Sequence, residues 1–147
     1  MEPVMNAEEL TGFLAEVFPQ VAFGTRDPTF RIAAVAPGAA TVILRAGERE
    51  LRPGGTVSGP ALFTLADVAA YTVILAHVGR EALAVTTNLN INFTRKAPPG
   101  EVVGQARLLK LGRKLAVFDV AMEAAGELVA HATGTYALPS RSAVGGD

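Results

Sequence analysis

The sequence predicts an α+β fold in which a curved antiparallel sheet of about six strands wraps around a long central helix, with an extra N-terminal helix. Three observations lead to this prediction. Residues 60–77 are apolar on most sides of a helix rather than along one stripe. Residues 85–93 alternate with a period of two, and three further strand-like runs follow them. A helix that is apolar on most sides needs a curved sheet with one apolar face to cover it.

The first part of the chain predicts one helix and one hairpin. Residues 7–18 carry apolar side chains at helical spacing, and Pro19 closes the segment. Two short strands are expected over residues 30–36 and 39–45, separated by the turn pair Pro37-Gly38. Residues 46–59 hold four glycines, a proline and several charges, so we expect a loop without regular structure there.

The second part predicts the central helix and four longer strands. Pro60 suits a helix start, and Gly79 provides a stop after about residue 77. The strand over residues 85–93 is expected to present Val85, Thr87, Leu89, Ile91 and Phe93 on one face, with Thr86, Asn88, Asn90 and Asn92 on the other. The runs 102–111, 115–123 and 128–138 are joined by short turns and predict an antiparallel meander.

The length of 147 residues predicts a single domain. We expect residues 1–29 to form the N-terminal helix and its connection, residues 30–138 to form the domain, and residues 139–147 to form a flexible tail. The N-terminus lacks the basic and apolar regions of a secretory signal, which favours a cytoplasmic location. The apolar run 61–76 is shorter than the roughly 20 residues that span a bilayer, so no membrane association is expected.

The composition excludes several classes of function. A net charge of -1 argues against nucleic-acid binding through phosphate neutralisation. The chain has no cysteine and two histidines, which excludes disulfide scaffolds, Cys/His zinc sites and thiol nucleophiles. We expect no metal, and we interpret His77 and His131 as ordinary helix-end and strand residues.

The loop before the central helix fits neither of two common motifs. A phosphate-binding loop would carry a lysine where Pro60 stands, and a nucleophile elbow would place its serine one position before Ser58. A third interpretation is that Gly59 presents a free backbone N–H at the helix N-terminus, where it can polarise a carbonyl. The alternative is that Gly59 and Pro60 only begin a helix.

Asp67 is the only charged side chain between residues 54 and 76. A structural interpretation pairs it with an arginine or with backbone donors, whereas a functional one makes it a general base toward water or a nucleophile. Asp67 lies eight residues beyond Gly59, which is roughly 12 Å along a helix. If both act on one substrate, Asp67 must come from a second copy whose helix runs antiparallel across a two-fold axis. The functional interpretation therefore requires a homodimer.

The strings SGPALFTLADVAAYTVILA and TTNLNINFTRKAPPGE resemble the PaaI-type acyl-CoA thioesterases of the hotdog fold, over residues 30–138. In that family a His-Gly-Gly motif precedes the catalytic acid; here Ser58-Gly59-Pro60 occupies the motif and Asp67 the acid. The resemblance implies that the Gly59 N–H polarises the thioester carbonyl and that Asp67 of the other subunit is nucleophile or base. It also implies that Thr86 positions the water or the carboxylate, with Thr87 facing the other way.

Three positions depart from the family pattern: Ser58 replaces a histidine, Pro60 removes a backbone donor, and Arg52 replaces an asparagine by spacing. The resemblance further implies that basic side chains hold the phosphates of coenzyme A, which is part of the substrate; no other cofactor is expected. The candidates are Arg95, Lys96, Arg113 and Lys114, whose alternative role is that of solvated surface charges. Asn88 is expected beside Thr86, on a polar face that lines the site or meets water.

The function that these residues favour is acyl-CoA thioester hydrolysis by a dimer or a dimer of dimers. One alternative is a hotdog protein that binds an acyl ligand without turning it over, because Arg52, Ser58 and Pro60 all depart from the motif. A further alternative is hydration of an enoyl thioester. Hydration would normally require a histidine paired with an acid, and neither histidine lies where such a pair is expected.

Overall fold

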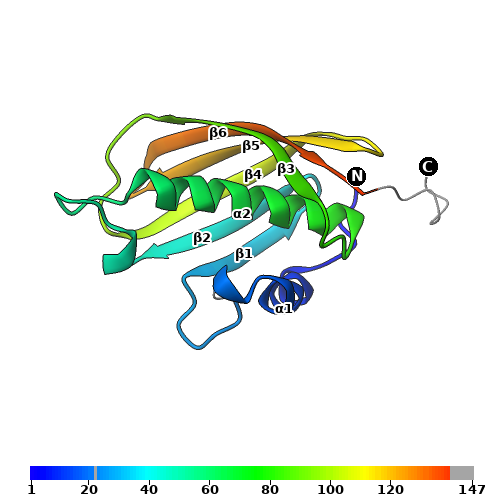
Figure 1. The fold of residues 1–147 in the computed structure, drawn as a ribbon, viewed down its shortest axis with the longest axis horizontal. Helices are drawn as coiled ribbons and strands as arrows, with labels where there is room; N and C mark the ends of the chain where they lie inside the picture. Colours follow the sequence, from blue (N-terminus) through cyan, green and yellow to red (C-terminus); the bar gives the residue numbers. More distant parts are fainter. Residues whose placement is uncertain (22, 140–147) are drawn as a thin grey trace.

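A curved antiparallel sheet of six strands wraps around helix α2 (Gly59–Val78), as the computed structural model of residues 1–21 and 23–139 shows (Figure 1). Helix α1 (Ala7–Val17) lies beside the first strand and α2. The strands are β1 (Phe30–Ala36), β2 (Ala39–Ala46), β3 (Val85–Phe93), β4 (Gly100–Leu111), β5 (Leu115–Ala124) and β6 (Glu127–Ala137). Their order across the sheet is β1-β2-β4-β5-β6-β3, with every neighbouring pair antiparallel. The predicted fold class is confirmed.

The bounds of the helices and strands agree with the sequence pattern to within about two residues, but two features differ. The predicted loop 46–59 contains a short 3-10 helix, Glu48–Glu50, and an isolated bridge between Leu51 and Val57. The Glu50 carboxylate accepts the Gly47 N–H at 2.7 Å, which stabilises that turn. The predicted meander covers β4, β5 and β6, whereas β3 crosses to the far edge beside β6. The domain bounds stay predictions, and residues 140–147 of the predicted tail lie outside the described residues.

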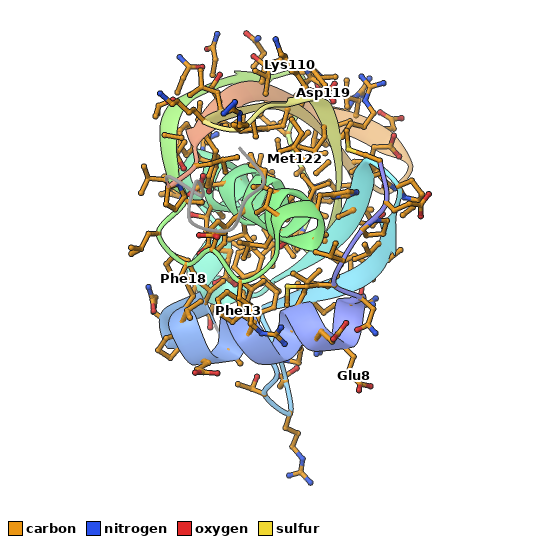
Figure 2. All side chains as sticks on the ribbon, turned by 90° about the vertical axis from the view of Figure 1, so that its right-hand side faces the viewer. Glu8, Phe13, Phe18, Lys110, Asp119 and Met122 are labelled. Carbon is orange, nitrogen blue, oxygen red and sulfur yellow. The ribbon has the colours of Figure 1, made fainter. Side chains whose placement is uncertain are left out.

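Helix α2 is the core of the molecule. Twelve of its twenty residues are buried, including Asp67's neighbours Leu65 and Ala66. Met122 points from the inner face of the sheet toward this helix (Figure 2). Of the described helices, α2 alone has the length and composition to cross a membrane, yet about two thirds of that segment is buried under the sheet. This burial is expected of a core helix, and the cytoplasmic location stays a prediction.

Both ends of α2 are held by polar contacts. Ser58 caps the N-terminus, and Gly79 ends the helix with a φ of 94°, which favours glycine. At the C-terminal end, the N–H groups of Val4 and Met5 both donate to the Ala76 carbonyl, at 2.6 and 3.2 Å. The N-terminal segment therefore closes the end of the core helix.

Helix α1 covers the side of the molecule below α2. A capping box formed by Asn6 and Glu9 begins it, and Leu10 and Leu14 are buried. Phe18, just beyond the helix, points toward α2, while Glu8 points away from the molecule (Figure 2). The ring of Phe18 meets that of Tyr71 edge-on, with the centroids 5.3 Å apart. Helix α1 thus supplies part of the apolar surroundings of α2.

Strand β3 contains a register shift that overturns the predicted alternation. Thr86 pairs with Tyr136, but Asn88 pairs with Thr135 and Leu89 with Gly134. Because paired residues share one face of a sheet, Thr86 and Leu89 both face the interior, which strict alternation would forbid. The prediction that Asn88 lies beside Thr86 on one face is therefore wrong. Thr87 falls within the shift, and its hydroxyl donates to the Thr135 carbonyl at 3.1 Å; its orientation away from Thr86 stays a prediction.

The outer face of the sheet carries a charged cluster made of Arg107, Asp119 and His131. Arg107 donates two hydrogen bonds to Asp119, at 2.9 and 2.8 Å, and the His131 Nε2 lies 3.0 Å from the same carboxylate. Asp119 is only 7% exposed although it lies on the outer face (Figure 2). The hydrogen bonds from Arg107 hold the pKa of the Asp119 carboxyl below its usual range, against the opposing effect of burial.

Gly134 offers a direct test of the packing between β3, β5 and β6. A Cβ atom at this position would lie 2.4 Å from the Asn88 carbonyl oxygen and 2.6 Å from Phe118 Cζ. Gly134→Ala should therefore lower the free energy of unfolding by at least about 2 kcal/mol, measured by urea denaturation. Gly12→Ala is the control: nothing lies within 4 Å of its new Cβ, and it should stabilise α1 by about 0.5–1 kcal/mol. An unchanged free energy of unfolding in Gly134→Ala would contradict this packing.

Asp119 predicts how stability responds to acid. Because its folded-state pKa lies below the unfolded value of about 3.9, its contribution is fully present above that pH and is lost as the pH falls through the folded pKa. Asp119→Asn should flatten the fall of stability on the acid side, measured by urea unfolding between about pH 2 and pH 7. Asp27→Asn is the control: it removes an exposed ion pair with Arg45 and should change the free energy of unfolding at pH 7 by no more than about 1 kcal/mol. Equal slopes in wild type and Asp119→Asn would refute the ion-pair assignment.

Candidate functional site

Asp67 lies in the middle of α2 and is held by two hydroxyl groups from the sheet. The Thr86 hydroxyl on β3 donates to Asp67 Oδ1 at 2.6 Å, and the Tyr136 hydroxyl on β6 donates to the same oxygen at 2.9 Å. The partners are neither an arginine nor backbone N–H groups, the two that the structural interpretation expected. In the single chain Asp67 is half-buried rather than fully buried.

Tyr136 is a site residue that the sequence pattern did not single out. Its ring stacks on Tyr71 and meets Phe118 edge-on, with both pairs of centroids 5.9 Å apart. Burial raises the pKa of the Tyr136 phenol far above its usual value, and the nearby charge of Asp67 raises it further. One signal could have found it, since a tyrosine on the core face of a strand needs a partner for its hydroxyl and Asp67 is the charged residue of the core helix.

The start of α2 leaves one backbone donor free. The Ser58 N–H donates to the Glu50 carbonyl at 2.8 Å, and the Ala61 N–H donates to the Ser58 side chain at 3.2 Å. Pro60 has no N–H at all. Among the described residues, the Gly59 N–H donates no hydrogen bond. A single unpaired amide therefore stands at the positive end of the helix dipole.

A cleft of about 420 Å³ opens beside Gly59. Its lining includes three cationic side chains, Arg52, Arg95 and Lys96, together with the exposed ring of Phe93. Arg95 also pairs with Glu127 at 2.7 Å, on the surface. The Phe93 ring packs against Gly59, since a Cβ there would lie 3.4 Å from Cζ. This cleft can accept an anionic ligand whose far end reaches the free amide.

A second, smaller pocket of about 130 Å³ adjoins Asp67. Its walls come from α1, the segment after it, α2 and β6, and they are mostly apolar; the lining is Leu14, Phe18, Gln20, Val21, Phe23, Thr64, Asp67, Val68, Tyr71 and Tyr136. This arrangement can hold a compact apolar group next to a carboxylate.

The structure does not bring all predicted site residues together. Gly59 and Asp67 line separate cavities in one chain, as the predicted spacing along the helix requires. Asn88 lies on the outer face and lines neither cavity. Arg113 and Lys114 follow β4 at the end opposite to the cleft, so they cannot join the cations at Gly59 within one chain.

Neither histidine faces Asp67. His77 is buried, donates from Nδ1 to the Val73 carbonyl at 2.8 Å, and accepts the Gly38 N–H at Nε2 at 2.9 Å. His131 belongs to the outer cluster with Asp119. Residues 1–21 and 23–139 contain no group of three or more His, Cys, Asp or Glu side chains that could hold a metal ion. The expectation that the chain needs no metal or further cofactor stays a prediction.

Comparisons with known proteins agree with this architecture. The sequence profile of the Thioesterase superfamily matches residues 54–131, from the loop before α2 into β6. A crystal structure from Silicibacter sp. TM1040, described as a candidate thioesterase, is 52% identical, with 95% of each chain covered and a TM-score of 0.84.

Two more distant relatives extend the comparison. The phenylacetic acid degradation protein PaaI from Thermus thermophilus is 29% identical, over 75% of this chain and 93% of that one, with a TM-score of 0.67. A protein of Pseudomonas aeruginosa that is named as a candidate esterase is 33% identical over 100 residues, which are 67% of this chain and 74% of its own. These similarities extend from the fold to the segment that carries Gly59, Asp67 and Thr86.

Proposed function

Because the chain belongs to the thioesterase superfamily and has the PaaI-type hotdog fold, we propose that it hydrolyses acyl-CoA thioesters at a site shared by two subunits. The observation that carries this proposal is the unpaired Gly59 N–H, which stands at the helix N-terminus beside a cationic cleft. The cleft suits a nucleotide and its phosphates, and the amide suits the oxygen of a carbonyl.

The shape of β3 supports a dimeric site. This strand is an edge of the sheet. Near one end Thr86 is hydrogen-bonded to Asp67, and at the other end Phe93 packs on Gly59. Two such edges that pair antiparallel about a two-fold axis bring the Thr86 end of one strand toward the Phe93 end of the other. Gly59 of one subunit then meets Asp67 of its partner.

Exposed apolar side chains adjoin the same edge. Phe63 and Phe93 are 41% and 53% exposed, and with Ile91 they line a shallow depression beside Gly59. A contiguous apolar surface next to an unpaired strand edge is what an interface between copies covers. We therefore take this edge as the subunit interface of the proposed enzyme.

The proposed reaction consumes one water and yields a free acid and the coenzyme A thiol. The Gly59 N–H donates to the carbonyl oxygen as negative charge develops there, an interaction worth about 2.7–4 kcal/mol in comparable sites. Asp67 of the partner acts either as base toward water or as nucleophile, the C–S bond breaks, and the leaving thiolate takes up a proton. The apolar pocket beside Asp67 receives the acyl group, and Arg52, Arg95 and Lys96 face the phosphates.

The first test is thiol release from a panel of acyl-CoA esters. Asp67→Asn should lower the rate by roughly 10²- to 10⁴-fold, because it removes the proposed base or nucleophile, while binding of the ester is kept. Thiol release is followed with a thiol reagent, and binding by calorimetry. A wild-type protein that binds the esters without releasing thiol would support the non-catalytic binding alternative. Equal turnover by Asp67→Asn would remove this carboxylate from the reaction.

A mixing experiment tests the shared site. Gly59→Pro removes the proposed donor but suits a helix start, since Ser58 already has the extended backbone that precedes proline (φ −71°, ψ 153°). Each variant alone should be inactive. Random mixing of Gly59→Pro and Asp67→Asn subunits makes half of the dimers mixed, each with one intact site, so about a quarter of wild-type activity should return. If both groups act from one subunit, no mixture regains activity.

A further inference from the structure

The two oxygens of the Asp67 carboxylate have different surroundings. Oδ1 accepts both hydroxyl hydrogen bonds, from Thr86 at 2.6 Å and from Tyr136 at 2.9 Å. Among the described residues no side chain or backbone group donates to Oδ2. The carboxylate is thus anchored through one oxygen, and the other is left for a ligand.

Of the two donors, Tyr136 is the one held firmly in place. It is 3% exposed, and its ring is fixed by Tyr71 on one side and Phe118 on another. Its hydroxyl also lies 3.4 Å from the Asp67 backbone carbonyl. Thr86, by contrast, is exposed at the start of an edge strand. A buried donor whose ring is packed on two sides can set the orientation of a half-exposed carboxylate.

The Tyr136 phenol acts on Asp67 as a donor only. Burial and the adjacent charge raise the pKa of this phenol, so it keeps its proton at neutral pH and does not itself serve as a base. The titratable side chains that line the pocket are Asp67, Tyr71 and Tyr136, and none of them is cationic. The Tyr71 hydroxyl donates instead to the Ala82 carbonyl at 3.0 Å. Tyr136 is therefore the buried donor that holds Asp67 Oδ1.

We propose that Tyr136 is the positioning residue of Asp67: together with Thr86 it fixes Oδ1, so that the carboxylate acts through Oδ2. This inference rests on the proposed function insofar as Oδ2 is the reacting atom. Tyr136 itself does not touch the substrate carbonyl. It sets the direction in which the free oxygen points across the interface.

Tyr136→Phe tests this role in the full-length protein. Loss of orientation should lower kcat by about 10- to 100-fold with little change in KM. Loss of a donor to one oxygen of the carboxylate should also move the acidic limb of the kcat/KM profile to higher pH. Tyr71→Phe is the matched control: it removes a hydroxyl from the stacked neighbouring ring and should leave the acidic limb in place. If the acidic limb of the kcat/KM profile lies at the same pH in Tyr136→Phe as in the wild type, the proposal is overturned.

A second measurement tests the same role if the Tyr136→Phe protein does not fold. The chain has two tyrosines, so growth of the Tyr71→Phe variant on 3-fluorotyrosine places one fluorinated phenol, at position 136. This more acidic phenol is a stronger donor and should move the acidic limb to lower pH, opposite in sign to Tyr136→Phe. A limb that does not move, or that moves to higher pH, refutes the donor role.

A readout without catalysis separates this proposal from the proposed function. The ¹³C resonance of the Asp67 side-chain carboxyl, recorded at one pH, should shift in Tyr136→Phe and stay in place in Tyr71→Phe, because of the two tyrosines only Tyr136 donates to this carboxylate. If the wild type releases no thiol from any ester, the proposed function fails while this resonance still tests the anchoring of Oδ1. If thiol is released but the resonance does not shift in Tyr136→Phe, the anchoring fails and the hydrolase stands.

Discussion

The fold depends on the burial of most of a helix that carries one carboxylate. Most of α2 lies under the sheet, so each buried polar group on this helix needs a partner. The side chains of Tyr71, Thr72 and His77 find theirs in backbone groups. At the N-terminus Ser58 leaves one donor free, and at Asp67 two strands each supply a hydroxyl. The candidate site is thus built where the otherwise apolar packing of the core helix is interrupted.

The elements could be predicted because their signals are local. Helical spacing, alternation and the positions of glycine and proline determined most bounds to within two residues. Two features could not be predicted, because both depend on pairing between residues far apart in sequence: the crossing of β3 to the edge beside β6, and the shift between Thr86 and Asn88. The shift has a role in the site, since it turns Thr86 inward without turning Leu89 outward.

The site could be predicted in part for the same reason. Gly59 and Asp67 lie on one helix and Thr86 begins the next strand, whereas Tyr136 reaches Asp67 only through the tertiary fold. The departures from the family motif acquire a physical meaning in the structure. The Ser58 side chain accepts the Ala61 N–H, and Pro60 has no N–H to donate. Gly59 is therefore the free amide of the first turn. The position of the basic pair Arg113-Lys114 could not be predicted, because two charges beside a turn do not reveal at which end of the sheet that turn lies.

The two sides of the Asp67 pocket come from different stretches of the chain. The walls from α2 (Thr64, Asp67, Val68 and Tyr71) lie within the segment that matches the superfamily profile, residues 54–131, but several apolar walls come from α1 and the turn after it, residues 7–21. Substitutions in that N-terminal stretch can reshape the cavity without altering the reacting groups. For the proposed hydrolase, the choice of acyl group and the rate of reaction can therefore change through substitutions in separate stretches of the chain.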